Sequence, residues 1–243
     1  MSRLFVVGIG PGKKDGMTLE ADAALACADV IAGYVRYVEL VRPYYPEKEF
    51  FTNGMMQEVD RCKAALKMAS SGKTVALVCS GDSGIYGMAG LVYELSSEYG
   101  EVEIEVIAGV TAASSGAAIL GAPLTNDFAV ISLSDLLTPW DVIEKRLSCA
   151  AMGDFCICLY NPSSQKRRDY LRKACDILLG YFSQNTLCGI ARNIGRAGEH
   201  ALVMTLGELR NQEVDMFSTV FIGNSNTKAM HGQMVTPRGY RDV

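Results

Sequence analysis

The sequence has little of the residue types that carry most metal and acid–base chemistry. It contains two histidines, His200 and His231, and one tryptophan among 243 residues. Histidine supplies many zinc ligands and much of the proton transfer that occurs near neutral pH. The eight cysteines include no pair separated by two residues, the spacing typical of zinc and redox motifs. We therefore expect no metal site and no histidine-based mechanism.

Basic charge and long apolar runs are also scarce. Lys and Arg total 23 against 27 Asp and Glu, a formal net charge of −4, whereas a protein that coats nucleic acid has a strong basic excess. No run reaches the roughly 18 apolar residues of a membrane span. Hydrophobic residues make up 49% of the chain, enough for a folded core. We expect a cytoplasmic protein that binds neither nucleic acid nor membrane.

Short apolar runs alternate with helical patterns along the chain, which is typical of an α/β fold. In the first half we expect strands at 4–8, 29–32, 73–80 and 103–107 and helices at 18–28, 34–41, 56–70, 85–99 and 111–120. In the second half we expect strands at 128–133, 155–160, 187–191, 201–205 and 219–223, a helix capped by Thr138, and a helix at 166–179. The buried early strands favour a mainly parallel sheet, and the closely spaced late strands favour a mixed one.

A segment rich in turn-forming residues divides the chain almost at its middle. Residues 121–127 read GAPLTND, with glycine, proline, asparagine and aspartate close together. We therefore expect two α/β lobes, residues 1–122 and residues 123–243.

Three glycine-rich turns follow predicted strands of the first half. They are GIGPG at 8–12, SGDSG at 80–84 and AGVTA at 108–112. Open α/β sheets bind ligands at the carboxyl ends of their strands, and glycine lets a ligand lie directly against the backbone. One such turn is common for structural reasons alone, but three at one sheet edge predict a ligand site.

These turns do not match the phosphate-binding motifs. Residues 13–17 separate Gly12 from the next helix, whereas a dinucleotide site opens directly into the helix that binds pyrophosphate. The strand that ends at Ala32 lacks the acidic residue that binds ribose, and no P-loop motif occurs. S-adenosylmethionine, which carries a sulfonium cation and no pyrophosphate, fits such a site. A nicotinamide-dependent reductase is the alternative from another class.

Motifs along the whole chain resemble those of the tetrapyrrole (corrin/porphyrin) methylase family. The motifs are VGIGPG at 7–12, SGDSGIYG at 80–87, GVTAA at 109–113, SLSDLLTPW at 132–140, YNP at 160–162, RN at 192–193 and TPRGY at 236–240. The resemblance extends from residue 5 to residue 240. Ser83 departs from it, because many members carry proline there, and this change is expected to alter the rigidity of the turn.

The resemblance implies a fold, a reaction and a set of partners. Members have two α/β lobes with the methyl donor S-adenosylmethionine in the cleft between them, and they are usually homodimers. The form of residues 133–140 is most similar to the branch that methylates C17 of a corrin precursor, cobalt-factor III or precorrin-3B, with ring contraction in cobalamin biosynthesis. A methylase for another ring position and a noncatalytic tetrapyrrole carrier remain alternatives.

The resemblance also implies which residues contact the donor. In the first lobe these are Pro11, Ser80, Gly81, Asp82, Ile85, Thr111 and Ala112. In the second lobe they are Tyr160, Asn161, Asn193, Ile194 and Gly239. Asp82 has a structural interpretation beside this one, because an aspartate at this place also forms an Asx turn before a helix. Both roles are compatible.

Catalytic and substrate-binding residues are predicted from their place beside these motifs. Asp135 follows the strand 128–133 and is the first candidate for proton transfer, with Ser134 and Tyr160 beside it. The substrate carries many carboxylates, and Arg36, Arg192 and Arg238 are the expected partners. The basic run Lys166–Arg168 with Arg172 has helical spacing, which is typical of a solvated face.

Overall fold

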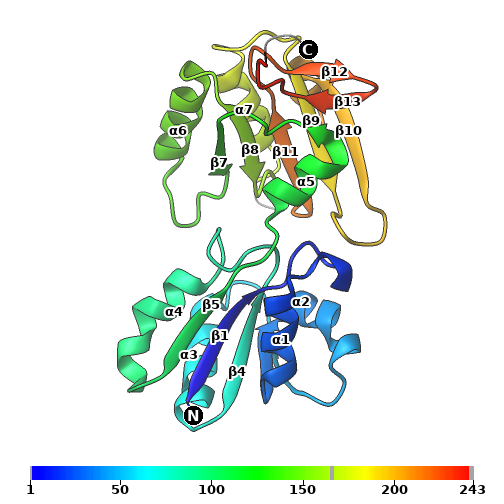
Figure 1. The fold of residues 1–243 in the computed structure, drawn as a ribbon. Coiled ribbons are helices and arrows are strands. Elements are labelled where there is room, and N and C mark those ends of the chain that lie inside the picture. Colours follow the sequence, from blue (N-terminus) through cyan, green and yellow to red (C-terminus); the bar gives the residue numbers. More distant parts are fainter. Residues whose placement is uncertain (1, 165–166, 241–243) are drawn as a thin grey trace. The chain divides into compact units, whose positions relative to one another are not determined.

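The computed structural model describes residues 2–164 and 167–240 and divides into two compact units, Met1–Ala112 and Ala113–Val243 (Figure 1). Both are α/β, as the sequence predicts. Helix α5 (Ala112–Leu120) and strand β6 (Gly121–Ala122), which we expected in the first lobe, pack in the second unit, where β6 pairs with β13. No helix in these described ranges is long and apolar enough to cross a membrane.

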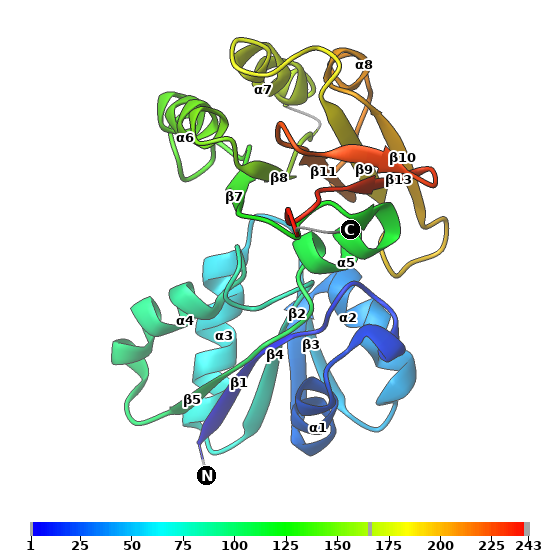
Figure 2. The same ribbon diagram turned by 45° about the horizontal axis from the view of Figure 1, so that its top comes forward.

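The first unit is a five-stranded parallel sheet with helices on both faces (Figures 1 and 2). The strands in spatial order are β3 (Glu49–Asn53), β2 (Val30–Tyr34), β4 (Thr74–Cys79), β1 (Arg3–Gly8) and β5 (Glu103–Ile107). The helices are α1 (Leu19–Cys27), α2 (Val35–Val41), α3 (Glu58–Ser70) and α4 (Ala89–Ser96), with short 3₁₀ turns at Lys14–Gly16, Arg42–Tyr44 and Ser97–Tyr99.

Strand β1 shows why this sheet is buried on both faces. Leu4 and Val6 pack in one apolar cluster with residues of α3 and α4, whereas Phe5 and Val7 pack in another with residues of α1 and α2. Successive side chains of a strand point to opposite faces, so a strand covered on both sides is apolar throughout. β1 pairs in parallel with β4 on one side and with β5 on the other, so the carboxyl ends of these three strands lie at one edge.

The second unit contains a mixed sheet and a small three-stranded sheet, as the late strands predict. The mixed sheet has the order β10 (His200–Thr205), β9 (Leu187–Arg192), β11 (Ser218–Ile222), β8 (Cys156–Tyr160) and β7 (Phe128–Ser132). The small sheet consists of β12 (Lys228–Met230), β13 (Gln233–Val235) and β6. In the mixed sheet only β7 and β8 pair in parallel, which places Ser132 beside Tyr160 at the carboxyl ends of both strands.

Helices cover this mixed sheet on both faces. Residues of α6 (Trp140–Met152), α7 (Tyr170–Leu178) and α8 (Leu206–Leu209) form one apolar cluster with side chains of the sheet. On the other side α5 approaches closely, because a Cβ at Gly116 would lie 2.8 Å from the ring of Phe221. Helix α7 begins later than the expected 166–179, and Lys166 lies outside the described residues.

Helix starts were predicted with mixed success. Thr18 caps α1 as expected, since its hydroxyl accepts a hydrogen bond from the Ala21 amide at 3.1 Å. The expected Thr138 cap is wrong, because α6 begins at Trp140 with Pro139 in the N-cap position and no side-chain cap. Helix α4 begins at Ala89 rather than near Ile85, since the glycine-rich segment before it stays irregular.

Four strands were not predicted: β3, β6, β12 and β13. β3 is an edge strand whose burial is only partial, and its sequence EFFTN lacks the continuous apolar pattern of its neighbours. β6 has two residues, and β12 is exposed throughout. Such short edge strands carry little of the hydrophobic periodicity on which sequence assignment depends.

The two threonines provide a matched test of helix capping. We expect Thr18→Ala to lower the free energy of unfolding by about 1 kcal/mol, because it removes the cap of α1. Thr138→Ala should change it by less than about 0.5 kcal/mol, because α6 receives no side-chain cap. Urea unfolding followed by circular dichroism measures both, and equal losses in the two variants would contradict the assignment.

Candidate functional site

The three glycine loops of the first unit meet at the carboxyl ends of β1, β4 and β5. Gly10 and Gly81 exchange two backbone hydrogen bonds, from the Gly10 amide to the Gly81 carbonyl at 3.0 Å and from the Gly81 amide to the Gly10 carbonyl at 2.8 Å. Both glycines have φ of +69°, a conformation that disfavours other residues. The first two loops are therefore joined through their backbones.

The third loop approaches so closely that side chains are excluded. A Cβ on Gly109 would lie 2.1 Å from the Gly81 carbonyl oxygen, and one on Gly8 would lie 2.7 Å from the Gly109 amide nitrogen. Neither neighbour is a flexible side chain that could move aside. The glycines of these motifs are thus required by packing between loops.

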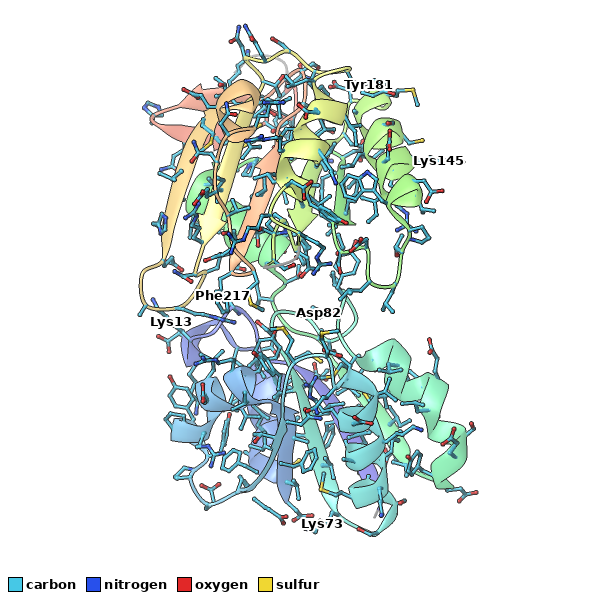
Figure 3. All side chains as sticks on the ribbon, turned by 180° about the vertical axis from the view of Figure 1, so that it is seen from behind. Lys13, Lys73, Asp82, Lys145, Tyr181 and Phe217 are labelled. Atoms are coloured by element: carbon cyan, nitrogen blue, oxygen red, sulfur yellow. The ribbon has the colours of Figure 1, made fainter. Side chains whose placement is uncertain are left out.

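Asp82 links the second loop to the third. Its Oδ1 accepts hydrogen bonds from the amides of Gly84 at 2.8 Å and Ile85 at 3.0 Å, and its Oδ2 accepts one from the Gly109 amide at 2.9 Å. The Asx-turn interpretation is confirmed, although the helix that follows begins only at Ala89. In Figure 3, Asp82 and Lys73 lie at opposite ends of β4.

Ser83 adds a further link between these loops. Its side chain is fully buried, and its hydroxyl donates to the Ile107 carbonyl at 2.9 Å. A proline at this position could not make this bond. The departure from the family pattern therefore places a side-chain hydrogen bond between the loop after β4 and the end of β5.

The remaining donor candidates of the first unit follow the same strands. Pro11 lies in the first loop, Ser80 directly follows β4, and Thr111 precedes α5, whose first residue is Ala112. The Ile85 side chain is 42% exposed. The structure thus gathers the predicted first-unit residues at one sheet edge, and their contact with a donor stays a prediction.

In the second unit, polar groups gather where β7 and β8 end. The Tyr160 hydroxyl accepts a hydrogen bond from the Ala113 amide at 2.6 Å, at the start of α5. Asn161 has φ of +52°, and its Nδ2 donates to the Ser132 hydroxyl at 2.9 Å. The same hydroxyl accepts from the Ser134 amide at 3.2 Å. Tyr160, Asn161 and Ser134, all predicted site residues, therefore belong to one edge.

Asp135 lies at this edge with two partners that the sequence did not predict. The Tyr170 hydroxyl donates to Asp135 Oδ2 at 2.5 Å, and Arg167 Nη1 lies 3.6 Å from Oδ1. Arg167 also donates to the hydroxyls of Ser134 and, at 3.0 Å from its Nε, Ser164. The hydrogen bond to Asp135 raises the pKa of Tyr170, so the phenol stays protonated as the donor.

This finding corrects one prediction about the basic run. Arg167 is not part of a solvated face, because its side chain is only 15% exposed and contacts Ser134 and Asp135. Arg168 is exposed, as expected. No spacing rule could have paired Asp135 with residues more than thirty positions away, since the parallel strands β7 and β8 bring them together.

The other predicted residues of the second unit lie on separate segments. Asn193 has φ of +50°, and its Nδ2 lies 3.4 Å from the Gly198 carbonyl. Ile194 is almost buried, whereas Gly239 is exposed with φ of +84°. These positions are compatible with ligand contact, which stays a prediction.

The three arginines expected to bind carboxylates differ in their surroundings. Arg36 is mostly exposed and lies 3.7 Å from Glu39 on the same helix. Arg192 ends β9 and donates to the Glu213 carbonyl. Arg238 is exposed. The structure therefore does not single out one of them as a substrate-binding residue.

Thiol and metal chemistry receive no support from the described residues. All eight cysteines are free, and burial raises the pKa of Cys62 to about 12 and of Cys79 to about 11, so these two thiols are unreactive at neutral pH. Residues 2–164 and 167–240 contain no group of three or more His, Cys, Asp or Glu able to hold a metal ion.

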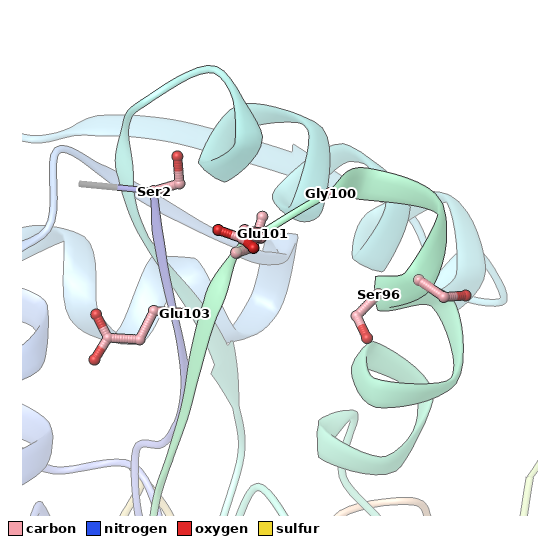
Figure 4. Close-up of a pocket in the computed structure, with 7 residues that line it drawn as sticks. Ser2, Ser96, Gly100, Glu101 and Glu103 are labelled. Carbon is pink, nitrogen blue, oxygen red and sulfur yellow. The ribbon is translucent and has the colours of Figure 1, made fainter.

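A hollow of about 530 Å³ lies in the first unit away from the glycine loops (Figure 4). Ser2, Glu101 and Glu103 line it, at the amino ends of β1 and β5. Ligands of parallel α/β sheets bind at the opposite, carboxyl ends. We therefore place the candidate site at the loops.

The sequence profile of the tetrapyrrole (corrin/porphyrin) methylases matches residues 3–210. The chain belongs to this family. It is 48% identical to the probable cobalt-factor III C(17)-methyltransferase of Salmonella typhimurium, over 98% of this chain and 99% of that protein. It is 44% identical to the cobalt-factor III methyltransferase of Priestia megaterium, of which it spans 45%. It is 38% identical to a precorrin-3B C(17)-methyltransferase from Sinorhizobium, over 98% of this chain and 96% of that protein.

Solved structures of tetrapyrrole methylases have the same fold. The methyltransferase CobJ superposes with a TM-score of 0.89 at 36% identity, over 96% of this chain and 99% of that one. The cobalt precorrin-4 methyltransferase CbiF has a TM-score of 0.76 at 24% identity, a likeness that speaks to the fold alone. The predicted two-lobed methylase architecture is confirmed.

The close approach of the loops leads to a prediction about Gly109. We expect Gly109→Ala to lower the free energy of unfolding by about 1–3 kcal/mol, because the added Cβ would displace the Gly81 backbone. Gly90→Ala is the matched control, since that helical glycine of the same unit has open space around it and should gain up to about 1 kcal/mol. Equal stability of the two variants in urea unfolding would contradict the packing argument.

Proposed function

We propose that this protein transfers a methyl group from S-adenosylmethionine to C17 of a corrin precursor, with ring contraction, in cobalamin biosynthesis. Cobalt-factor III is the preferred substrate, and precorrin-3B is the alternative. The observation that carries the proposal is the 48% identity to the Salmonella typhimurium enzyme over nearly the whole of both chains. Four relatives named for cobalt-factor III are 42–48% identical, above the 38% of a relative named for precorrin-3B.

The charge of the glycine loops fits this donor. Residues 8–12, 80–84 and 108–112 contain no lysine or arginine, and Asp82 is their one charged side chain. Lys14, just beyond the first loop, is paired with Asp22 at 3.2 Å. Positive charge favours a phosphate ligand, whereas S-adenosylmethionine carries a sulfonium and an ammonium group, which an acidic edge attracts. The loops therefore suit a cationic ligand held against backbone.

Methyl transfer demands approach geometry more than a strong side-chain nucleophile. When bound, the donor supplies the methyl group: a ring carbon forms the new C–C bond with its electron pair, the S–CH₃ bond breaks with its pair on sulfur, and positive charge passes to the macrocycle. The loops' part is orientation, which supplies roughly 7–11 kcal/mol in well-aligned reactions. The Gly10–Gly81 pair and Asp82 keep the donor loops in one arrangement.

The proposal also assigns roles to residues of the second unit and to three arginines. Tyr160 holds the Ala113 amide, and Ala113 directly follows the predicted donor contact Ala112. Asn161, Asn193, Ile194 and Gly239 stay predicted donor contacts, and Arg36, Arg192 and Arg238 stay predicted partners of substrate carboxylates. Asp135 with Ser134 stays the predicted catalytic group. The homodimer implied by the resemblance and the cytoplasmic location expected from the composition also belong to this proposal.

Incubation of the purified protein with S-adenosylmethionine and either cobalt-factor III or precorrin-3B tests the reaction. We expect the product of cobalt-factor III to gain the mass of one methyl group, with S-adenosylhomocysteine formed in equal amount. Mass spectrometry after labelling with a deuterated methyl group measures both. Turnover of precorrin-3B alone would overturn the choice of substrate, and binding of a tetrapyrrole without any mass gain would favour a carrier.

Two variants of Asp82 separate its roles. Asp82→Asn keeps one acceptor for the turn amides but removes the charge and, because an amide NH₂ cannot accept a hydrogen bond, also the acceptor for the Gly109 amide. We expect donor affinity to fall roughly 10- to 100-fold. Asp82→Ala should weaken binding at least as much, because the acceptor for the Gly84 and Ile85 amides is then lost as well. Calorimetry with S-adenosylhomocysteine measures affinity, and the exposed Asp60→Asn is the control. Unchanged affinity in Asp82→Asn would leave only the turn role.

A further inference from the structure

The Tyr170 hydroxyl makes one contact that the fold does not require. The Tyr170 ring packs against Trp140, with ring centroids 4.6 Å apart, and Lys173 lies 4.9 Å from the ring centroid. These contacts would remain with phenylalanine in its place. Helix α7 begins at Tyr170, and Asp135 does not cap it, because its N-cap residue is Asp169. The role of the hydroxyl is therefore its hydrogen bond to the Asp135 carboxylate.

We infer that Tyr170 is a positioning residue that holds the Asp135 carboxylate in one orientation for methyl transfer. The inference rests on the proposed function, in which Asp135 with Ser134 is the predicted catalytic group. Oδ2 accepts from the Tyr170 hydroxyl at 2.5 Å, while Oδ1 lies 3.6 Å from Arg167 Nη1. The two partners approach different oxygens, so together they fix the plane of the carboxylate.

A fixed carboxylate has a clear use in this reaction. The macrocycle gains positive charge as the new C–C bond forms, and a negative group that is already oriented stabilises that charge without reorganising. Asp135 is followed by Leu136 and Leu137, which are 64% and 98% exposed, so no apolar packing of these neighbours holds the segment. Orientation of Asp135 therefore depends on its polar partners.

Tyr170→Phe tests the inference with little disturbance of packing. We expect kcat for methyl transfer to fall roughly tenfold, with the dissociation constant of S-adenosylhomocysteine unchanged, because neither Tyr170 nor Asp135 is a predicted donor contact. The control is Tyr181→Phe, a half-exposed tyrosine of the same unit, which should leave kcat unchanged. Asp135→Asn should lower kcat more, and the double variant should be no slower than Asp135→Asn alone.

Ionisation of the phenol provides a readout that is independent of activity. The hydrogen bond to Asp135 raises the pKa of Tyr170, with Asp169 adding to this and Arg167 opposing it; Lys173 also faces the ring. Because the carboxylate favours the protonated phenol, Asp135→Asn should lower the pKa of Tyr170 towards its ordinary value. Phenolate absorbance is measured as the pH rises, for the wild type and for Asp135→Asn, each with and without Tyr170→Phe. The difference within each pair gives the ionisation of Tyr170 alone.

The outcomes distinguish this inference from the proposed function. Loss of kcat in Tyr170→Phe, together with a lowered phenol pKa in Asp135→Asn, would support it. An active wild type with unchanged kcat in Tyr170→Phe would overturn the inference alone, as would a phenol pKa that does not respond to Asp135→Asn. A wild type that binds S-adenosylhomocysteine but methylates neither corrin precursor would overturn the proposed function and the inference with it.

Discussion

The two hydrogen bonds between the backbones of Gly10 and Gly81 are the constraint on which the candidate donor site depends. They join the loops after β1 and β4, and Asp82 extends the connection to Gly109 after β5. All three loops end adjacent parallel strands, so the sheet places them close enough for the contacts. Because these contacts are made by backbone, the loops need glycine where a Cβ would strike a neighbouring carbonyl. The motif glycines follow from this geometry.

The sequence revealed most of the fold, because buried strands and amphipathic helices have clear periodicity. β1 and β4 are apolar on both faces and were predicted almost to their ends. The failures share a physical cause. β3 is a partly buried edge strand and β12 an exposed one, and the existence of both depends on pairing with a neighbour. Helix α5 was assigned correctly, but its packing in the second unit is shown by tertiary contacts, such as the one between Gly116 and Phe221, which the sequence does not reveal.

The candidate site was predictable where it consists of local motifs and not where it consists of long-range pairs. The three glycine loops and the Asx turn of Asp82 were visible in short windows of sequence. Arg167 and Tyr170 were not, because their partner Asp135 lies on the loop after a different strand. A basic run at helical spacing predicts a solvated face, and only the parallel pairing of β7 with β8 turns Arg167 towards Ser134 and Asp135.

The carboxylates of Asp82 and Asp135 are held by different kinds of partner. The oxygens of Asp82 accept hydrogen bonds from three backbone amides. Any movement of this carboxylate therefore also moves the loops after β4 and β5. Asp135 is held by two side chains, a phenol and a guanidinium. Substitutions beside Asp135 can therefore change how it is held while the strand ends stay in place. At the first edge, by contrast, an added Cβ at Gly8 or Gly109 must displace backbone. In the first unit, main-chain contacts thus set the arrangement of the glycine loops. In the second unit, side chains set the orientation of the Asp135 carboxylate.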